Sequence, residues 1–132
     1  GHKNIPELIK SIELPREWQK ELKLYCDDNG IEFMSTPFDE RAVDELYDLG
    51  VKRFKIAGFE STDPRLVKYV ASTKLPLIIS LGIGTDFNTM VQIKNWILEV
   101  NNNPDITFLH CNNAYPTPFE DINLKQLGFT FL

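Results

Sequence analysis

Four short apolar segments alternate with longer amphipathic segments along this chain, and no other feature of the sequence constrains the fold as strongly. The apolar segments are rich in β-branched and aromatic residues and run over residues 31–38, 53–59, 76–82 and 106–112. Strands that alternate with helices in this way are typical of βα units built on a parallel sheet. Because the segments are almost continuously apolar, we expect helices to cover both faces of an open sheet or to surround a closed barrel.

The amphipathic segments carry helix signals at their ends. A cap residue or an early proline predicts helix starts at Pro15, Asp39 and Asp63, and an apolar face predicts a further helix over roughly residues 86–100. Glycine or a turn before proline predicts helix ends at Gly30, Gly50 and Asn101. The helix that begins at Pro15 precedes the first predicted strand, and the other three connect the strands.

Length and charge restrict the possible classes of protein. A chain of 132 residues with 42% hydrophobic residues can bury one core, so we expect a single domain. The net charge of −5 argues against nucleic acid or an anionic membrane surface as the main partner, although it allows a local phosphate site. No apolar run is long enough to span a bilayer and no signal peptide is visible, so we expect a cytoplasmic protein.

Two features at the level of single residues need no catalytic explanation. Gly1 and His2 are interpreted as the remnant of a tag, which leaves residues 3–132 as the domain. Cys26 and Cys111 lack the spacing of a zinc site and are expected to be free thiols in a reducing compartment.

Three polar residues interrupt the apolar strands. Lys55, Ser80 and His110 each lie within or near the carboxyl end of a predicted strand, which is the edge where parallel α/β folds bind ligands. Lys55 could hold a phosphate or carboxylate, form a Schiff base, or extend to solvent. His110 and Cys111 are adjacent and point to opposite faces, so they cannot readily bind one metal together.

Two further candidates lie where predicted strands end. Thr36 either binds an anionic ligand through its hydroxyl or only terminates its strand. Glu60 follows the second strand and could orient a sugar hydroxyl or move a proton. The Gly82–Gly84 pair does not make a dinucleotide-binding fingerprint.

Several of these segments together resemble the N-acetylneuraminate (sialic acid) synthase family, which includes the pseudaminic acid and spore-coat polysaccharide synthases. The resemblance runs from about Leu14 to Leu124 and is carried by GIEFMSTPFD at residues 30–39, KIAGFE at 55–60, PLIIS at 76–80 and HCNNAYPTP at 110–118. It implies condensation of phosphoenolpyruvate with N-acetylmannosamine or a related hexosamine, which gives a nine-carbon 2-keto acid and phosphate.

The resemblance also implies roles for individual residues. Phosphoenolpyruvate would bind to Thr36, Lys55, Ser80, Asn113 and Tyr115, and Glu60 would act at the sugar as the candidate catalytic residue. Two hydroxyls of the family pattern are missing, because Gly58 replaces a usual serine and Leu81 stands where Ser-Thr-Gly is usual. The family enzyme uses manganese or magnesium, but its two metal-binding histidines lie beyond Leu132. We therefore expect no metal site and no cofactor in this chain.

The family's catalytic domain is a (β/α)₈ TIM barrel of about 250 residues. This chain matches strands three to six, so we expect about half of that barrel, without the small antifreeze-like domain that commonly follows it. The exposed sheet edges predict a homodimer, with a monomeric open sheet as the alternative. By itself the chain is expected to be inactive. A non-enzymatic sugar- or phosphate-binding or interaction module and a Schiff-base aldolase that uses Lys55 are alternative functions.

Overall fold

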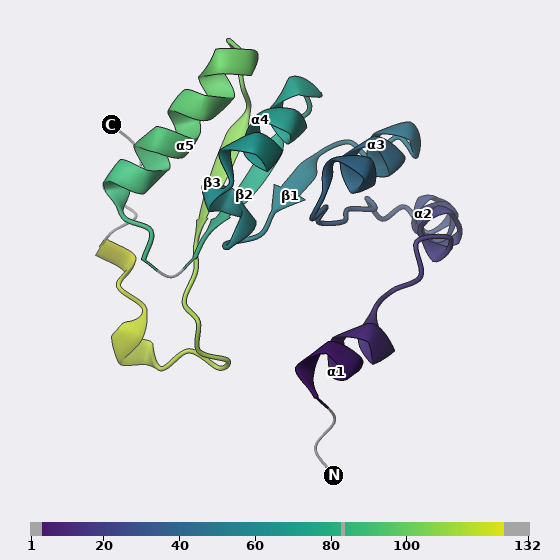
Figure 1. Ribbon diagram of the computed structural model, residues 1–132, viewed down its shortest axis with the longest axis horizontal. Coiled ribbons are helices and arrows are strands. Elements are labelled where there is room, and N and C mark those ends of the chain that lie inside the picture. Colours follow the sequence, from purple (N-terminus) through teal and green to yellow (C-terminus); the bar gives the residue numbers. More distant parts are fainter. Residues whose placement is uncertain (1–3, 83, 126–132) are drawn as a thin grey trace. The chain divides into compact units, whose positions relative to one another are not determined.

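A computed structural model describes residues 4–82 and 84–125 of the chain (Figure 1). Its backbone contacts divide the chain into two compact units, residues 1–33 and 34–132. Among the described residues, no helix is long and apolar enough to cross a membrane.

The first unit contains two helices, α1 (Ile5–Ile12) and α2 (Trp18–Asp28). The side-chain oxygen of Asn4 caps α1 by accepting a hydrogen bond from the N–H of Glu7 at 3.0 Å. Gly30 follows α2 with φ +68°, which confirms the predicted glycine stop. The predicted helix start at Pro15 falls three residues before the observed one, and α1 was not predicted.

The second unit is built on a parallel sheet in the order β1 (Phe54–Ile56), β2 (Leu77–Leu81), β3 (Ile106–His110). Where its residues are described, this unit also contains the helices α3 (Glu40–Asp48), α4 (Pro64–Ser72) and α5 (Phe87–Val100). Two short 3₁₀ helices, η1 (Glu60–Thr62) and η2 (Phe119–Asp121), follow β1 and β3. The alternation of strands and helices confirms the predicted βα units.

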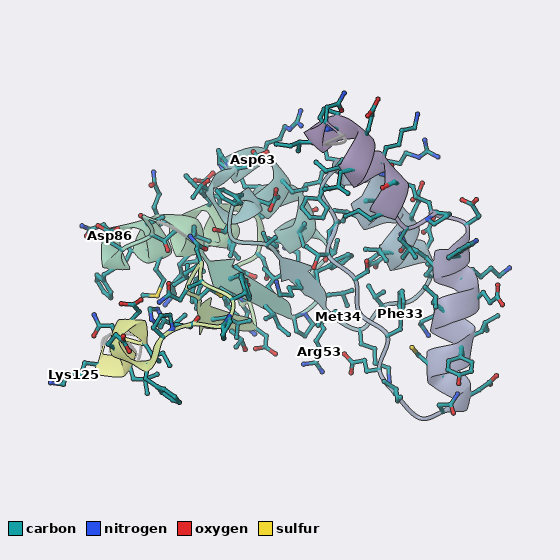
Figure 2. The ribbon with its side chains drawn as sticks, turned by 90° about the horizontal axis from the view of Figure 1, so that it is seen from below. Phe33, Met34, Arg53, Asp63, Asp86 and Lys125 are labelled. Carbon is teal, nitrogen blue, oxygen red and sulfur yellow. The ribbon has the colours of Figure 1, made fainter. Side chains whose placement is uncertain are left out.

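Helices α4 and α5 pack against each other and lie on one side of the sheet (Figures 1 and 2). On that side the residues of β1 and the first residues of β2 are buried, whereas those of β3 are half-buried. The core includes Phe54, Ile56, Leu77 and Ile79 from the sheet with Val43, Leu46, Val67, Val70, Ile93 and Ile97 from the helices. The alternating positions of β1 and β2 include Lys55 and Ile78, which are only half-buried.

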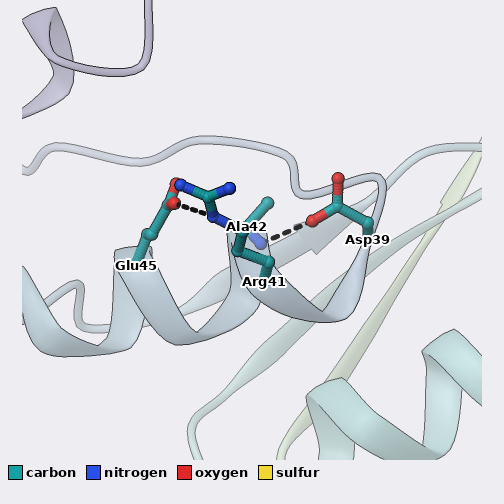
Figure 3. A network of polar contacts seen from close by, with 4 residues as sticks. All are labelled: Asp39, Arg41, Ala42 and Glu45. Atoms are coloured by element: carbon teal, nitrogen blue, oxygen red, sulfur yellow. Dashed lines mark hydrogen bonds and ion pairs between the residues drawn. The ribbon is translucent and has the colours of Figure 1, made fainter.

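Aspartate residues cap α3, α4 and α5, and the sequence predicts the first two of these caps. The carboxylate of Asp39 accepts a hydrogen bond from the N–H of Ala42 at 2.6 Å, and one turn along α3 the Arg41 Nε donates to Glu45 at 2.8 Å (Figure 3). Asp63 and Asp86 cap α4 and α5 in the same way (Figure 2). These caps satisfy N–H groups that the helices themselves leave unpaired.

The predicted strand over residues 31–38 is wrong, because this segment has no strand assignment and β1 pairs only with β2 among the described residues. The N–H of Ile31 donates to the carbonyl of Cys26 at the end of α2, and Pro37 has no N–H to donate. The other predicted strands are present but shorter. Strand β1 ends earlier than predicted because the chain turns after it, and the N–H of Ser61 donates a hydrogen bond to the carbonyl of Ala57.

Asp86 gives a testable pH dependence. Hydrogen bonds from the backbone N–H and hydroxyl of Thr89 lower the pKa of its carboxyl below the ordinary 3.8. Because the folded-state pKa lies below the unfolded one, the cap contributes stability above the unfolded pKa and loses it as pH falls through the folded pKa. Asp86→Asn retains an acceptor oxygen without titrating, so acid should lower its melting temperature less than that of wild type. Identical pH profiles of the two melting temperatures would contradict this account.

Candidate functional site

Lys55 and Ser80 lie on the same face of the sheet, on neighbouring strands. Lys55 in β1 is paired with Ile78 in β2, and Ser80 is the next residue of β2 that points to the same side. The register continues this face onto Thr107 and Leu109 of β3. It is the face opposite to the buried core side chains, and no helix of this unit's described residues covers it in Figure 2.

The ammonium of Lys55 has no hydrogen-bond or ion-pair partner among residues 4–82 and 84–125. Its side chain is half-buried, and its cross-strand neighbour on this face is the apolar Ile78. A half-buried ammonium loses part of its hydration without gaining a counter-charge, and an anion can supply that charge. Lys55 is therefore the strongest candidate for a phosphate or carboxylate ligand.

The nearby helix N-termini offer less to an anion than Lys55 does. Helix α4 follows β1 and α5 follows β2, so both begin at the edge where these strands end. However, the carboxylates of Asp63 and Asp86 already accept hydrogen bonds from the first-turn N–H groups. Each carboxylate also places a negative charge at the positive end of its helix. The positive charge available at this edge is thus the one on Lys55.

Glu60 lies at the first position of η1, directly after the turn that follows β1. It is half-buried, and η1 contacts β2 as well as α4 and α5. The turn brings Gly58 against Gly82, because a Cβ built on Gly58 would lie 2.9 Å from the Gly82 Cα. The ends of β1 and β2 are therefore held close together at Gly58 and Gly82.

His110 does not join this group. The prediction placed Lys55, Ser80 and His110 at one edge, and the parallel strands do end at a common edge. His110 is paired with Leu81, however, and shares its side of β3 with Ile106 and Phe108. That is the helix-covered side of the sheet, so His110 points away from Lys55 and Ser80. Polar residues near the ends of successive strands therefore do not necessarily share one face of the sheet.

The other three candidates lie in segments outside the sheet. Thr36 is half-buried beside the buried Pro37, Asn113 is exposed, and Tyr115 is 93% exposed. The hydrogen bonds of the described residues do not connect any of these side chains with Lys55 or Ser80. The structure therefore places Lys55 and Ser80 on one face of the sheet, and leaves the positions of Glu60 and of these three residues relative to them as predictions.

The described residues contain no group of three or more His, Cys, Asp or Glu side chains that could hold a metal ion. They do contain one relevant residue that the sequence did not suggest. Ser61 is completely buried, and its hydroxyl donates to the carbonyl of Gly58 at 2.8 Å. A serine after a glutamate carries no signal of burial, so only the fold reveals it.

These features define an α/β protein with a candidate anion site at the carboxyl edge of a parallel sheet. The family model described as the NeuB family matches residues 1–129. The chain belongs to the NeuB family. It is 40% identical over 123 residues to the N,N'-diacetyllegionaminic acid synthase of Legionella pneumophila, covering 92% of this chain and 35% of that protein. With the pseudaminic acid synthase of Campylobacter jejuni it shares 36% identity over 121 residues, again covering 92% and 35%.

Solved structures of similar proteins agree with the assignment to this family. The sialic acid synthetase of Leptospira borgpetersenii superposes with a TM-score of 0.85 at 25% identity, over 94% of this chain and 42% of that chain. The spore coat polysaccharide biosynthesis protein of Bacillus subtilis superposes with a TM-score of 0.80 at 33% identity, over 98% and 36%. The chain thus spans about a third of the length of the curated relatives it matches.

Proposed function

We propose that this chain forms the phosphoenolpyruvate-binding part of a synthase of nine-carbon 2-keto acids. The complete enzyme would condense phosphoenolpyruvate with N-acetylmannosamine or a related hexosamine and release phosphate. Membership of the NeuB family supports the reaction class, since relatives are named pseudaminic acid and legionaminic acid synthases. The observation that carries the proposal is the half-buried Lys55, whose ammonium has no partner among the described residues, beside the buried Ser80 on the sheet face opposite the helices.

The chemistry of the residues fits this ligand. Phosphoenolpyruvate carries a phosphate and a carboxylate, and the ammonium of Lys55 can bind either of them as a charge-assisted donor. The hydroxyl of Ser80 can donate to a second oxygen, and Thr36, Asn113 and Tyr115 would complete the binding group. The Leptospira relative was crystallised in complex with citrate, which is also a multiply charged carboxylate.

Glu60 is assigned to the sugar. Its carboxylate follows β1 at the same edge as Lys55, where it can accept a hydrogen bond from a hexosamine hydroxyl or move a proton during the condensation. The resemblance places the metal-binding histidines of the family enzyme beyond Leu132, so the divalent metal would be held there. We assign no step of the reaction to a metal in this chain.

The fold proposed for residues 3–132 is about half of a TIM barrel in a cytoplasmic protein. In it β1, β2 and β3 would correspond to strands four to six of the family barrel, and residues 31–38, which form no strand here, would stand in the place of strand three. The parallel βα units and the likeness to family structures support this interpretation. The outer edges of β1 and β3 have no strand partner among the described residues, which supports a homodimer that pairs these edges. Sedimentation at high concentration should then show a dimer, and a monomer alone would exclude it.

The experiment that tests the proposed function compares three ligands on the purified chain. Calorimetry should show saturable binding of phosphoenolpyruvate, weaker binding of inorganic phosphate and still weaker binding of pyruvate, because only the first carries both anionic groups. Addition of N-acetylmannosamine and manganese should give no turnover. Borohydride treatment with pyruvate should leave no adduct on Lys55, and an adduct would instead establish the Schiff-base aldolase. Absence of phosphoenolpyruvate binding at millimolar concentration would contradict the proposal.

A further inference from the structure

Ser61 is a buried polar residue to which the proposed function gives no role. Its exposed fraction is 0%, although it follows the half-buried Glu60 in η1. Its hydroxyl donates to the carbonyl of Gly58 at 2.8 Å, and its backbone N–H donates to the carbonyl of Ala57 at 2.9 Å. A hydroxyl in the interior is costly unless it is hydrogen-bonded, and the bond to Gly58 meets that requirement.

The two carbonyls that Ser61 binds belong to the turn between Lys55 and Glu60. The same turn meets the end of the neighbouring strand, since a Cβ on Gly58 would lie 2.9 Å from the Cα and 3.2 Å from the backbone nitrogen of Gly82. A continuous line of contacts therefore runs from Ser61 in η1 through Gly58 after β1 to Gly82 after β2. This line connects the segments that carry Lys55, Glu60 and Ser80.

A neighbouring hydroxyl provides an internal comparison. Thr62 donates to the carbonyl of Phe59 at 3.0 Å with the same three-residue separation, but its side chain is exposed. Water can replace that bond at small cost, whereas the hydroxyl of the buried Ser61 is shielded and would be left without a partner if its bond to Gly58 broke. The buried bond is consequently the one that can fix the geometry of the turn.

We propose that Ser61 is a positioning residue of the anion site. Its hydroxyl holds the turn of residues 57–60 against Gly82 and so sets the positions of Lys55 and Glu60 relative to Ser80. The proposal rests on the proposed function in that phosphoenolpyruvate is the ligand whose binding depends on this geometry. Ser61 itself does not touch the ligand.

The test uses the whole chain with four substitutions and two measurements. Ser61→Ala removes the hydroxyl, Ser61→Cys keeps the volume with a weak donor, and Ser61→Thr keeps the hydroxyl. Thr62→Val is the matched control, because it removes the exposed hydroxyl that makes the equivalent bond. The measurements are the affinity for phosphoenolpyruvate and the hydrogen exchange of the amides of residues 61 and 63, which donate to Ala57 and Glu60.

We expect Ser61→Ala and Ser61→Cys to weaken phosphoenolpyruvate binding about tenfold and to speed exchange of the two amides by a similar factor. Ser61→Thr should restore both properties, and Thr62→Val should change neither. If the extra methyl of threonine prevents folding, the comparison of alanine, cysteine and the Thr62→Val control still decides the result.

Three outcomes would overturn the proposal. Wild-type affinity in Ser61→Ala with only a lower melting temperature would show a purely structural role. Wild-type affinity and wild-type amide exchange in Ser61→Cys would show that the volume of the side chain matters and its hydrogen bond does not. Unchanged amide exchange in Ser61→Ala would show that the turn does not depend on the hydroxyl. If wild type itself binds no phosphoenolpyruvate, the proposed function fails, and the exchange measurement still decides whether Ser61 holds the turn.

Discussion

Replacing Lys55 by methionine is expected to raise the dissociation constant for phosphoenolpyruvate about 10- to 100-fold, the effect of losing one hydrogen bond from a charged donor. Methionine is unbranched like lysine, so the packing beside Ile78 should be retained while the charge is lost. Titration calorimetry of the folded variant gives the constant directly. Circular dichroism should show an unchanged fold, because the ammonium has no partner among the described residues.

The control for this prediction is Lys52→Met. Lys52 is exposed in the segment before β1, so the variant removes the same charge from the chain at a site outside the uncovered sheet face. Long-range charge effects on a small anion are screened over about 10 Å at moderate salt, so we expect little change in affinity. Equal losses in the two variants would mean that net charge governs binding, and no loss in Lys55→Met would remove Lys55 from the site.

Gly58→Ser is expected to destabilise the chain by about 1–3 kcal/mol, the usual cost of crowding a packed position. The family that the sequence resembles usually has a serine at this position, but in this chain the new Cβ would lie 2.9 Å from the Cα of Gly82. The neighbouring atoms are backbone atoms, which cannot rotate away as a side chain can. The ends of β1 and β2 would have to separate, and the free energy of unfolding measured in urea should fall.

Gly58→Ala separates the two possible causes. Alanine brings the same Cβ without the hydroxyl, so crowding predicts a similar loss of stability in both variants. A loss in Gly58→Ser alone would instead indicate a cost of burying the hydroxyl. Wild-type stability in both variants would show that the two strand ends move apart easily, and the close approach of Gly58 and Gly82 would then not constrain the site.

The sequence predicts those parts of this fold that depend on local signals. Asp39 and Asp63 act within three residues of their own position, so an aspartate before an amphipathic segment is enough to predict each helix start. The strands β1, β2 and β3 lie inside predicted segments, because a short apolar run between two helices is typical of a buried strand in an α/β fold. Helix α1 also has such a signal, in the apolar residues Ile5, Leu8, Ile9 and Ile12 at helical spacing, although the first predicted helix begins only at Pro15.

Apart from α1, the parts that were not predicted depend on partners distant in the sequence. A segment such as residues 31–38 becomes a strand only if another strand lies beside it, and β1 offers it no hydrogen bonds in the described structure. The face on which His110 lies depends on the register with β2, which hydrophobicity alone does not give. The burial of Ser61 depends on the contacts of η1 with α4, α5 and β2.

The most direct test of the central claim, that the uncovered sheet face around Lys55 binds phosphoenolpyruvate, is a titration of the isotope-labelled chain followed by nuclear magnetic resonance. We expect concentration-dependent shifts of the backbone signals of Lys55, Ser80 and Glu60, with the outward-facing residues of α4 and α5 unchanged. In Lys55→Met the same titration should give no saturable shifts. Shifts confined to the helices, or none at any residue of β1 and β2, would contradict the account.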